Sequence, residues 1–529
     1  MSPRPAPPRR PGKDPRAERH APQRLLDAEI FARETAEDRR RVVVIGGGIA
    51  GMAAAAVLAE GGANVRLLER EHQLGGRVRS WPLPDGRTMS RGFHAFFRQY
   101  YNLRELLRRA DPDLSALVPL EDYPLVDASG RTDTFAGLPL TPPFSVAAFA
   151  LRSESFPARQ VARVDVRRAM ALLAVDYPRS FGDFDGMSAA EVLDRLRFPK
   201  AARHLALEVF ARSFFADPRD FSGAELVAMF HTYFMGSAEG LIFDVPRGDY
   251  DRTLWAPLGH YLWTRGVQTE TGVTVTGLED IDGEDGPLRV HLAGREPLEA
   301  DAVVLATDRA PLQQLVADSG LGDPGWRQRI AMLAGTPRFV VWRMWLDTPL
   351  AAETAPFVGT AGLGLLDNIS AVHLFEDEAA AWAREHGGSV VELHAYAVRD
   401  EVTDEEVRED LRAQMLRLHP ELRDAATLHE EWLVADDCHL ITPEPWSERP
   451  GVLTPDPRVV LAGDGIRVDL PVALMERAAT TGMLAASALL MRCGLPGQDL
   501  WSPPMTGALA PRRLHEGVRR VLPGRSGRQ

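Results

Sequence analysis

The stretch VVVIGGGIAGMAAAAVLAEGGANVRLLE, from Val42 to Glu69, decides the fold of this chain. The apolar run Val42–Ile45 predicts a buried parallel strand, and Met52–Glu60 predicts a helix. Val65–Leu68 predicts a second strand, which is followed at once by an acid. The turn between the first strand and the helix has the pattern G-x-G-x-x-G, made by Gly46, Gly48 and Gly51.

This order of strand, glycine turn, helix, strand and acid is typical of a βαβ unit that binds a dinucleotide. The glycines let the backbone approach a pyrophosphate, which the N–H groups and the dipole of the helix N-terminus stabilise. Glu69 lies about 20 residues after the glycines, where a carboxylate accepts hydrogen bonds from a ribose. The predicted contacts also include Ile49, Ala50 and Arg70, which adjoin these residues.

Two distant segments indicate that the dinucleotide is FAD. In LGGRVRS, Gly75 and Gly76 make a turn, and Arg77 offers a fork of donors to a phosphate. Near the C-terminus, the predicted strand Val459–Ala462 is followed by Gly463 and Asp464, whose carboxylate could hold the sugar-alcohol chain. The predicted helix Val472–Leu490 is rich in small residues, and its N-terminal end could face the flavin through Met475 and Ala478.

Together these motifs resemble the FAD-dependent amine oxidase and carotenoid desaturase superfamily. The resemblance implies an α/β fold: a discontinuous, Rossmann-like FAD-binding domain with an inserted α+β substrate domain, as in amine oxidases and phytoene desaturases. It places Val275, in the predicted strand Val273–Leu278, near the adenine, and returns the chain under the cofactor through a strand at Leu298–Thr307. The expected FAD-binding domain comprises residues 41–115, 265–315 and 455–495, and the substrate domain residues 116–264 and 316–454.

The substrate domain has two clear local patterns. Phe339–Leu346, FVVWRMWL, predicts a half-buried strand. Thr403–Leu418 predicts a helix that opens with a capping box between Thr403 and Glu406.

The segment after the Arg77 turn indicates the substrate. Carotenoid desaturases of the plant and cyanobacterial type have a similar motif, which falls here on Gly92, Phe93, His94, Phe96, Phe97, Tyr100, Asn102 and Leu103. Ala473–Gly482, ALMERAATTG, also resembles that branch, whereas Arg98 replaces a glycine that is usual there. The block Ala211–Pro246 is most similar to one subgroup, the isorenieratene synthases.

The resemblance implies an FAD-dependent desaturase/methyltransferase that converts the β-ionone rings of β-carotene into aromatic φ-rings. A β-ring contains a carbon that bears two methyl groups, so one methyl must move before the ring can become aromatic. The reduced flavin must then pass its electrons to an acceptor. A linear-carotene desaturase or isomerase, a flavin amine oxidase and a non-enzymatic isoprenoid carrier of related fold are the alternatives.

Candidate catalytic residues are those that can accept a proton or stabilise a carbocation. The proton acceptors are His94, His231 and Glu239, with Asp244 as a further possibility. Aromatic faces stabilise cations, and the candidates are Phe93, Phe96, Phe230, Tyr233, Phe234 and Trp255. For any single one of these aromatic side chains, plain core packing is the favoured interpretation.

Net charge and cysteine content indicate which partners and which cellular compartment to expect. The net charge of −13 argues against nucleic acid as a partner. Cys438 and Cys493 form no spaced pair and no metal-binding cluster, which favours a reducing cytoplasm and predicts no metal. Residues 1–40 and 503–529 are rich in Pro and Arg and are expected to be a disordered and a flexible tail.

One segment predicts peripheral contact with the cell membrane, where a carotene resides. Pro142–Leu151, PPFSVAAFAL, is apolar. Basic residues follow it, at Arg152, Arg159, Arg163 and Arg167. An apolar patch in the leaflet beside basic residues at anionic headgroups is a monotopic pattern.

Overall fold

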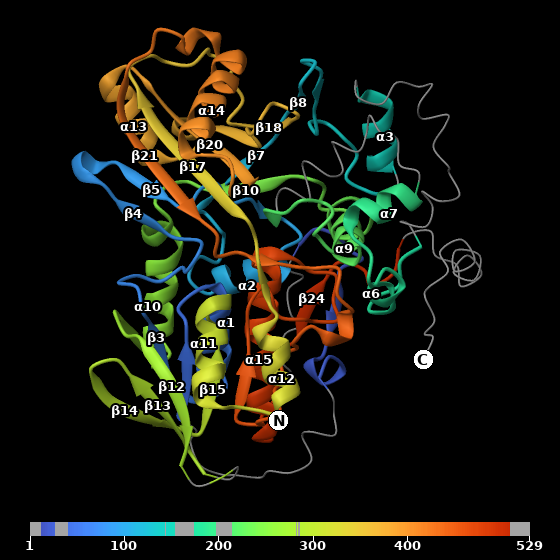
Figure 1. Ribbon diagram of the computed structural model, residues 1–529, viewed down its shortest axis with the longest axis vertical. Helices are drawn as coiled ribbons and strands as arrows, with labels where there is room; N and C mark the ends of the chain where they lie inside the picture. The colour runs from blue at the N-terminus through green and yellow to red at the C-terminus, as the bar shows by residue number, and fades with distance from the viewer. Residues whose placement is uncertain are drawn as a thin grey trace, which may run out of the picture.

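The computed structural model describes residues 12–26, 41–142, 144–153, 174–196, 214–281, 283 and 286–507, and Figure 1 shows two large sheets toward opposite ends of its long axis. The lower sheet is five-stranded and wholly parallel, in the order β11-β3-β2-β15-β23. Its strands are β2 (Arg41–Ile45), β3 (Asn64–Glu69), β11 (Gln268–Thr271), β15 (Ala302–Leu305) and β23 (Val459–Leu461). The predicted α/β fold and its βαβ unit are confirmed.

Two long helices pack closely against this sheet. Helix α1 (Ile49–Glu60) and helix α15 (Leu474–Arg492) approach so nearly that a Cβ at Gly482 would lie 2.2 Å from the carbonyl oxygen of Ala50. The small residues predicted for α15 therefore serve this close approach. Around the same core lie α10 (Ala256–Thr264), α11 (Arg309–Ser319), α12 (Pro324–Ala331) and a small antiparallel sheet of β12 (Val275–Asp280), β13 (Leu288–Leu292) and β14 (Arg295–Ala300).

The upper sheet is seven-stranded and forms the centre of the substrate domain. Its order is β21-β17-β20-β19-β18-β8-β9. Its strands are β8 (Leu125–Asp127), β9 (Thr132–Asp133), β17 (Arg338–Leu346), β18 (Phe357–Ala361), β19 (Asn368–Ala371), β20 (Ser389–Val398) and β21 (Thr427–Ala435). Helix α13 (Asp377–His386) and helix α14 (Asp404–Leu418) accompany it, and the predicted capping box of Thr403 and Glu406 is present.

Shorter elements connect the two sheets. The helices are α2 (Tyr101–Arg108), α3 (Phe144–Arg152), α6 (Arg179–Asp183), α7 (Ala189–Arg195) and α9 (Gly223–Phe230). A three-stranded sheet contains β6 (Phe96–Phe97), β7 (Leu117–Leu120) and β10 (Phe243–Pro246). Two-stranded sheets pair β1 (Glu18–His20) with β24 (Leu500–Ser502), β4 (Ser80–Pro82) with β5 (Thr88–Ser90), and β16 (Ala334–Gly335) with β22 (His439–Leu440). Among the described residues, no helix is long and apolar enough to cross a membrane.

Two predicted strands differ from the observed ones. Leu298–Thr307 is not one strand, because the chain passes at Asp301 from β14 in the small sheet to β15 in the parallel sheet. The strand predicted to be half-buried is buried on both faces from Phe339 to Leu346. Its charged residue, Arg343, is only 2% exposed and is paired with buried glutamates.

Two helices lie beside the predicted domain limits. Residues 256–264 form α10, and its Leu258 and Leu262 join the core that packs on the parallel sheet. Residues 324–331 form α12, and its Trp326 and Ile330 join the same core. The limits at residues 264 and 316 stay predictions.

Neither predicted tail is wholly without structure. Within residues 1–40, β1 pairs with β24, and the backbone N–H of Asp14 donates to Glu239 at 2.8 Å. Residues 503–507 also pack on the body, where the carbonyl of Met505 accepts from the N–H of Tyr177 at 2.9 Å. Specific pairing, which composition does not reveal, orders these stretches. The remainder of both predicted tails lies outside the described residues.

Candidate functional site

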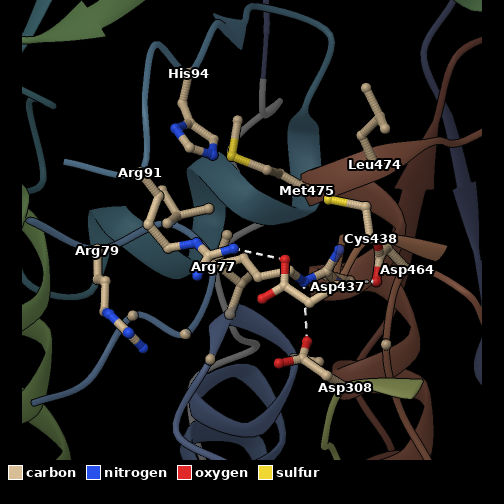
Figure 2. Close-up of a pocket in the computed structure, with 18 of the residues that line it drawn as sticks. Arg77, Arg79, Arg91, His94, Asp308, Asp437, Cys438, Asp464, Leu474 and Met475 are labelled. Atoms are coloured by element: carbon tan, nitrogen blue, oxygen red, sulfur yellow. Dashed lines mark hydrogen bonds and ion pairs between the residues drawn. The ribbon is translucent and has the colours of Figure 1, made fainter. Parts of the chain in front are cut away.

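A large cavity joins the glycine turn of the lower domain to the upper sheet. It contains about 2550 Å³ of space free of protein atoms, its open mouth included. Every predicted cofactor residue lines it except Gly51. Figure 2 shows part of the lining, with Arg77, Asp308, Asp464 and Met475 on one side and His94 above them.

The glycine turn brings two backbones close together at the cavity wall. A Cβ on Gly76 would lie 3.1 Å from the α-carbon of Gly48, and Gly76 has a φ of +57°. Gly48 precedes α1 and offers no side-chain cap, and the first N–H groups of a helix have no intrahelical partner. The N–H groups of Ile49 and Ala50, which line the cavity, are therefore available to an anion.

Gly51 has a different role from the other two glycines of the motif. A Cβ at Gly51 would lie 1.8 Å from the carbonyl oxygen of Gly46, so no other residue fits there without moving the turn. Gly51 thus fixes the packing of α1 on the turn and does not line the cavity.

Glu69 is buried beside this turn, and backbone donors hold it in place. Its two carboxylate oxygens accept hydrogen bonds from the N–H groups of Gly47, at 2.6 Å, and Glu71, at 2.9 Å. A carboxylate oxygen accepts more than one hydrogen bond, so Glu69 retains capacity toward a ligand in the cavity that it lines.

Arg77 lies between two carboxylates in the same part of the cavity. It donates to Asp308 through Nε at 2.9 Å and to Asp464 through Nη2 at 2.5 Å (Figure 2). Burial alone would raise the pKa of Asp464, but the charge of Arg77 lowers it to about 2, so Asp464 is ionised. Asp308, at the start of α11, was not predicted from the sequence.

The other part of the cavity is walled by aromatic rings. Of the predicted rings, Phe93 and Tyr233 line it, whereas Phe96, Phe230, Phe234 and Trp255 do not. Trp255, for example, is packed under Gly75 and is fully buried. The further lining aromatic residues are Phe97, Tyr100, Tyr123, Phe215, Phe243, Phe339, Phe357 and Tyr396.

His94 has the geometry of an oriented, neutral base. Its Nδ1 lies 2.8 Å from the carbonyl oxygen of Gly92, which fixes Nδ1 as the protonated nitrogen. Burial lowers the pKa of His94 to about 4, so the ring is neutral at physiological pH. Its Nε2 has no hydrogen-bond partner among the residues that the structure describes, and the side chain lines the cavity.

The other candidate bases lie outside the cavity lining. His231 is buried, and its Nε2 donates to the carbonyl of Pro504 at 2.6 Å. Glu239 is also buried and binds the N-terminal segment through Asp14. Asp244 forms ion pairs with Arg98 at 3.3 Å and Arg104 at 2.7 Å. The structure does not bring His231 and Glu239 to the cavity, because both make structural contacts outside its lining, and their catalytic role stays a prediction.

Several motif positions that suggested a carotenoid desaturase have structural explanations. Asn102 donates from its backbone and side chain to Glu476 at 2.9 and 2.8 Å, which ties the start of α2 to α15. Arg98 replaces the usual glycine without a clash, because it pairs with Asp244. Gly92 has a φ of +103°, and a Cβ there would lie 2.7 Å from the ring of His394.

Polar residues on the upper sheet also line the cavity and were missed from the sequence. They are Asp367, Asn368, His394 and Tyr396. A signal for part of this set exists in β20, where Glu392, His394 and Tyr396 alternate with apolar residues in SVVELHAYAV. Charged and polar residues with period two in a buried strand indicate a row on one face.

The residues at the lower part of the cavity fit FAD. Gly48 and Gly76 approach too closely for a side chain at Gly76, and beside them the start of α1 supplies N–H donors that suit a pyrophosphate. Glu69 at the end of β3 suits a ribose. Arg77, Asp464 and the start of α15 are placed to contact the rest of the cofactor. The fold and the site thus define an FAD-binding oxidoreductase.

Comparisons with known proteins agree with this class. The sequence profile of the flavin containing amine oxidoreductase family matches residues 49–490. The chain is 51% identical over 480 residues to a carotenoid phi-ring synthase from Streptomyces griseus, covering 89% of this chain and 92% of that protein. A carotenoid phi-ring synthase from Chlorobaculum tepidum is 26% identical over 89% of this chain and 91% of its own length.

A solved structure shows the same fold. Putrescine oxidase bound to putrescine superposes with a TM-score of 0.63 at 15% identity, over 85% of this chain and 99% of the oxidase. The chain belongs to the flavin-containing amine oxidoreductase family, and FAD is its cofactor.

Proposed function

We propose that this flavoprotein converts the β-rings of β-carotene into aromatic φ-rings, by desaturation coupled to a 1,2-shift of a ring methyl group. The observation that carries the proposal is the continuity of the cavity: the FAD-binding groove opens directly onto walls of aromatic rings. The identity of 51% with a carotenoid phi-ring synthase over nearly the whole chain supports it.

The substrate's chemistry sets what the site must do. Forming the arene from a β-ring removes two pairs of hydrogens and moves one methyl from the quaternary carbon to its neighbour. Bound FAD supplies the acceptor for each hydride. The chain must therefore orient an apolar ring, keep water away, stabilise a cation and take up protons.

Aromatic side chains meet the first three of these needs. The Phe93 ring lies 5.6 Å from that of Phe243 and 4.4 Å from that of Phe357, in edge-on and tilted arrangements. Each ring face that a cation contacts contributes about 0.5–2 kcal/mol, the larger values when water is absent. The aromatic wall therefore favours an apolar substrate whose reaction passes through a carbocation.

His94 is our proposed proton acceptor. Its ring is neutral, its Nδ1–H is held by Gly92, and its side chain lines the cavity, as a general base requires. Met475, at the N-terminal end of α15, lines the same cavity. It is the one residue of the predicted catalytic set that the cavity geometry supports.

Product analysis separates this function from its alternatives. Purified protein with bound FAD and an added quinone acceptor would receive β-carotene or lycopene in vesicles, or an aliphatic diamine in buffer. Aromatic-ring products from β-carotene alone are expected. Dehydrogenation of a linear carotene would instead favour a desaturase, and amine-dependent hydrogen peroxide an amine oxidase.

We further propose peripheral contact with a membrane through α3 and the loop before it. Phe144 is 67% exposed and Leu151 85% exposed, which is unusual for large apolar side chains on one short helix. Arg152 adjoins them and is exposed, as binding to anionic headgroups requires. Arg159, Arg163 and Arg167 lie outside the described residues. A carotene dissolved in the leaflet could enter the protein from this side.

A further inference from the structure

A row of polar side chains on strand β20 reaches the aromatic part of the cavity. Glu392, His394 and Tyr396 share one face of the strand, because side chains alternate along it. His394 and Tyr396 line the cavity, and Glu392 lies behind them at 1% exposure. The residues that fit FAD do not include this row.

Hydrogen bonds connect the row, with each donor pointing from Tyr396 through His394 toward Glu392. His394 Nε2 lies 2.8 Å from Glu392 Oε1, and its Nδ1 lies 2.7 Å from the hydroxyl of Tyr396. Burial alone would raise the pKa of Glu392, but the charge of Arg343 lowers it to about 2, so this carboxylate accepts and Nε2 donates. Nδ1 must then accept from the Tyr396 hydroxyl.

Charged groups lie directly behind the row. Arg343 donates to Glu392 at 2.8 Å and to Glu376 at 3.1 Å, and all three side chains are buried. Burial raises the pKa of Glu376 to about 7. Glu392 stays ionised beside Arg343, so His394 Nε2 faces a buried carboxylate.

The backbone is irregular directly after Tyr396. Ala397 has a φ of +50°, which is uncommon for a residue other than glycine. The pairing of β17 with β20 shifts register here, between Arg338 and Val340, as in a β-bulge. Bulges and strained residues occur at functional sites, where they re-aim side chains.

Asp367 and Asn368 fix this bulge from the neighbouring strand. The N–H of Tyr396 donates to Asp367 at 2.6 Å, and Asn368 Nδ2 donates to the Tyr396 hydroxyl at 3.1 Å. Within the part of the chain that the structure describes, the buried Asn368 Oδ1 has no hydrogen-bond partner, although Asn368 lines the cavity. The Tyr396 hydroxyl is thus held in place, with its proton directed to His394.

We propose that Tyr396 and His394 form a second proton-accepting pair, which takes up a proton released from the substrate ring. In this step a C–H bond of the ring cation breaks, and its electron pair forms the new C=C bond. The proton goes to the Tyr396 oxygen as the original hydroxyl proton moves to His394 Nδ1. The result is a neutral tyrosine and an imidazolium paired with Glu392.

This inference rests on the proposed function, in which hydride removal with FAD as oxidant produces the cation. Two protons leave each ring in that reaction, and His94 is the proposed acceptor for one of them. The two histidines lie on either side of the Gly92 peptide: its carbonyl binds His94, and its α-carbon packs against His394. A second acceptor beside the first therefore suits the stoichiometry.

The test compares two conservative variants with the wild type. Tyr396→Phe removes only the hydroxyl. His394→Asn keeps a side-chain oxygen able to accept the hydrogen bond from Tyr396, but that oxygen is not a base. Aromatic product is measured with β-carotene in vesicles and a quinone acceptor, together with bound flavin. Tyr177→Phe is the matched control, because that hydroxyl is buried, unpartnered and outside the cavity lining.

Both variants should keep their flavin and their KM for β-carotene within about twofold, while kcat falls about 100-fold or more, the usual contribution of general base catalysis. Tyr177→Phe should match the wild type. A wild-type kcat in either Tyr396→Phe or His394→Asn would overturn the inference. The hydrogen bonds of the row would then have a structural role only. If Tyr396→Phe loses flavin, the kcat of His394→Asn decides between the proton-accepting and the structural role. A wild type without aromatic product would refute the proposed function and this inference together.

Discussion

Gly48→Val tests the assignment of the glycine turn to FAD, because this position combines open space with an ordinary backbone conformation. Gly48 has φ −76° and ψ −174°, which any residue adopts. A Cβ there would meet no protein atom closer than the α-carbon of Gly76, at 3.8 Å. The folded apoprotein therefore tolerates the change. The added methyl groups instead enter the cavity that Gly48 lines, beside the N-terminus of α1.

The size of the effect on FAD follows from this geometry. Overpacking a tight contact costs about 1–3 kcal/mol. Since 1.4 kcal/mol corresponds to about tenfold in affinity, FAD should bind roughly 5- to 150-fold more weakly. The free energy of unfolding should change little, because two effects oppose each other. Replacing a glycine at a helix N-cap destabilises the folded state. Replacing any glycine also lowers the conformational entropy of the unfolded chain, which stabilises the fold by a similar amount.

A second glycine of the same motif provides the contrast. Gly51→Ala places a Cβ 1.8 Å from the Gly46 carbonyl oxygen and should lower the stability of the fold itself. Gly277→Val is the control, since a Cβ there meets nothing within 4 Å and Gly277 does not line the cavity.

The assay combines the flavin-to-protein absorbance ratio, FAD titration and thermal unfolding of the apoproteins. Gly48→Val should be folded but bind FAD more weakly and retain less flavin than the wild type, Gly51→Ala should melt earlier, and Gly277→Val should match the wild type in flavin content. A Gly48→Val protein that retains wild-type FAD affinity would refute the placement of the pyrophosphate.

Three further predictions follow from side chains around the site. The double variant Phe144→Asp with Leu151→Asp should keep its flavin but lose vesicle binding and β-carotene conversion. Leu428→Asp, a change at another exposed apolar residue, should keep all three properties. If the double variant sediments with vesicles as well as the wild type does, the α3 surface is not the membrane contact. Glu69→Gln should retain more FAD than Glu69→Ala, because the amide oxygen can still accept from Gly47, and FAD titration measures the difference. Burial lowers the pKa of His231 from 6.5 to about 4, so its contribution to stability rises with pH through that window and is lost as pH falls. The destabilisation caused by His231→Gln in urea unfolding should therefore shrink by about 2 kcal/mol between about pH 7 and pH 5, and a constant difference would contradict this.

Phe149 is unsuitable as a membrane probe, although it lies on the same apolar helix. Its ring stacks on Phe135 at 5.1 Å with an interplanar angle of 4°. An aspartate there would disturb the substrate domain itself. Phe149 packs against the protein, whereas Phe144 and Leu151 are exposed. The sequence alone does not reveal how the helix is oriented against the rest of the protein.

The cofactor half of the site was predictable because its signals are local. Strand, glycine turn, helix and acid fall within Val42–Glu69, and each glycine meets a steric demand that a short sequence motif expresses. Arg77 and Asp464 were found as separate motifs, and the structure joins them in one ion pair.

The catalytic half was harder to predict because its contacts are long-range. His231 and Glu239 lie in a block similar to carotenoid enzymes, yet Pro504 and Asp14, from the two ends of the chain, bind them. Arg343 made β17 look half exposed, although glutamates from other elements neutralise it. Asn368 and His394 belong to different strands, and only the sheet brings them together.

Isotope tracing tests the central claim, ring aromatisation with migration of the substrate's own methyl group, most directly. β-Carotene labelled with ¹³C only in its ring methyls would be supplied to a host that expresses the chain, with unlabelled methionine in the medium. The account predicts an aromatic carotenoid that retains the label in every ring methyl. A product whose ring methyls are diluted by methionine carbon, or a host that forms no aromatic ring, would contradict it.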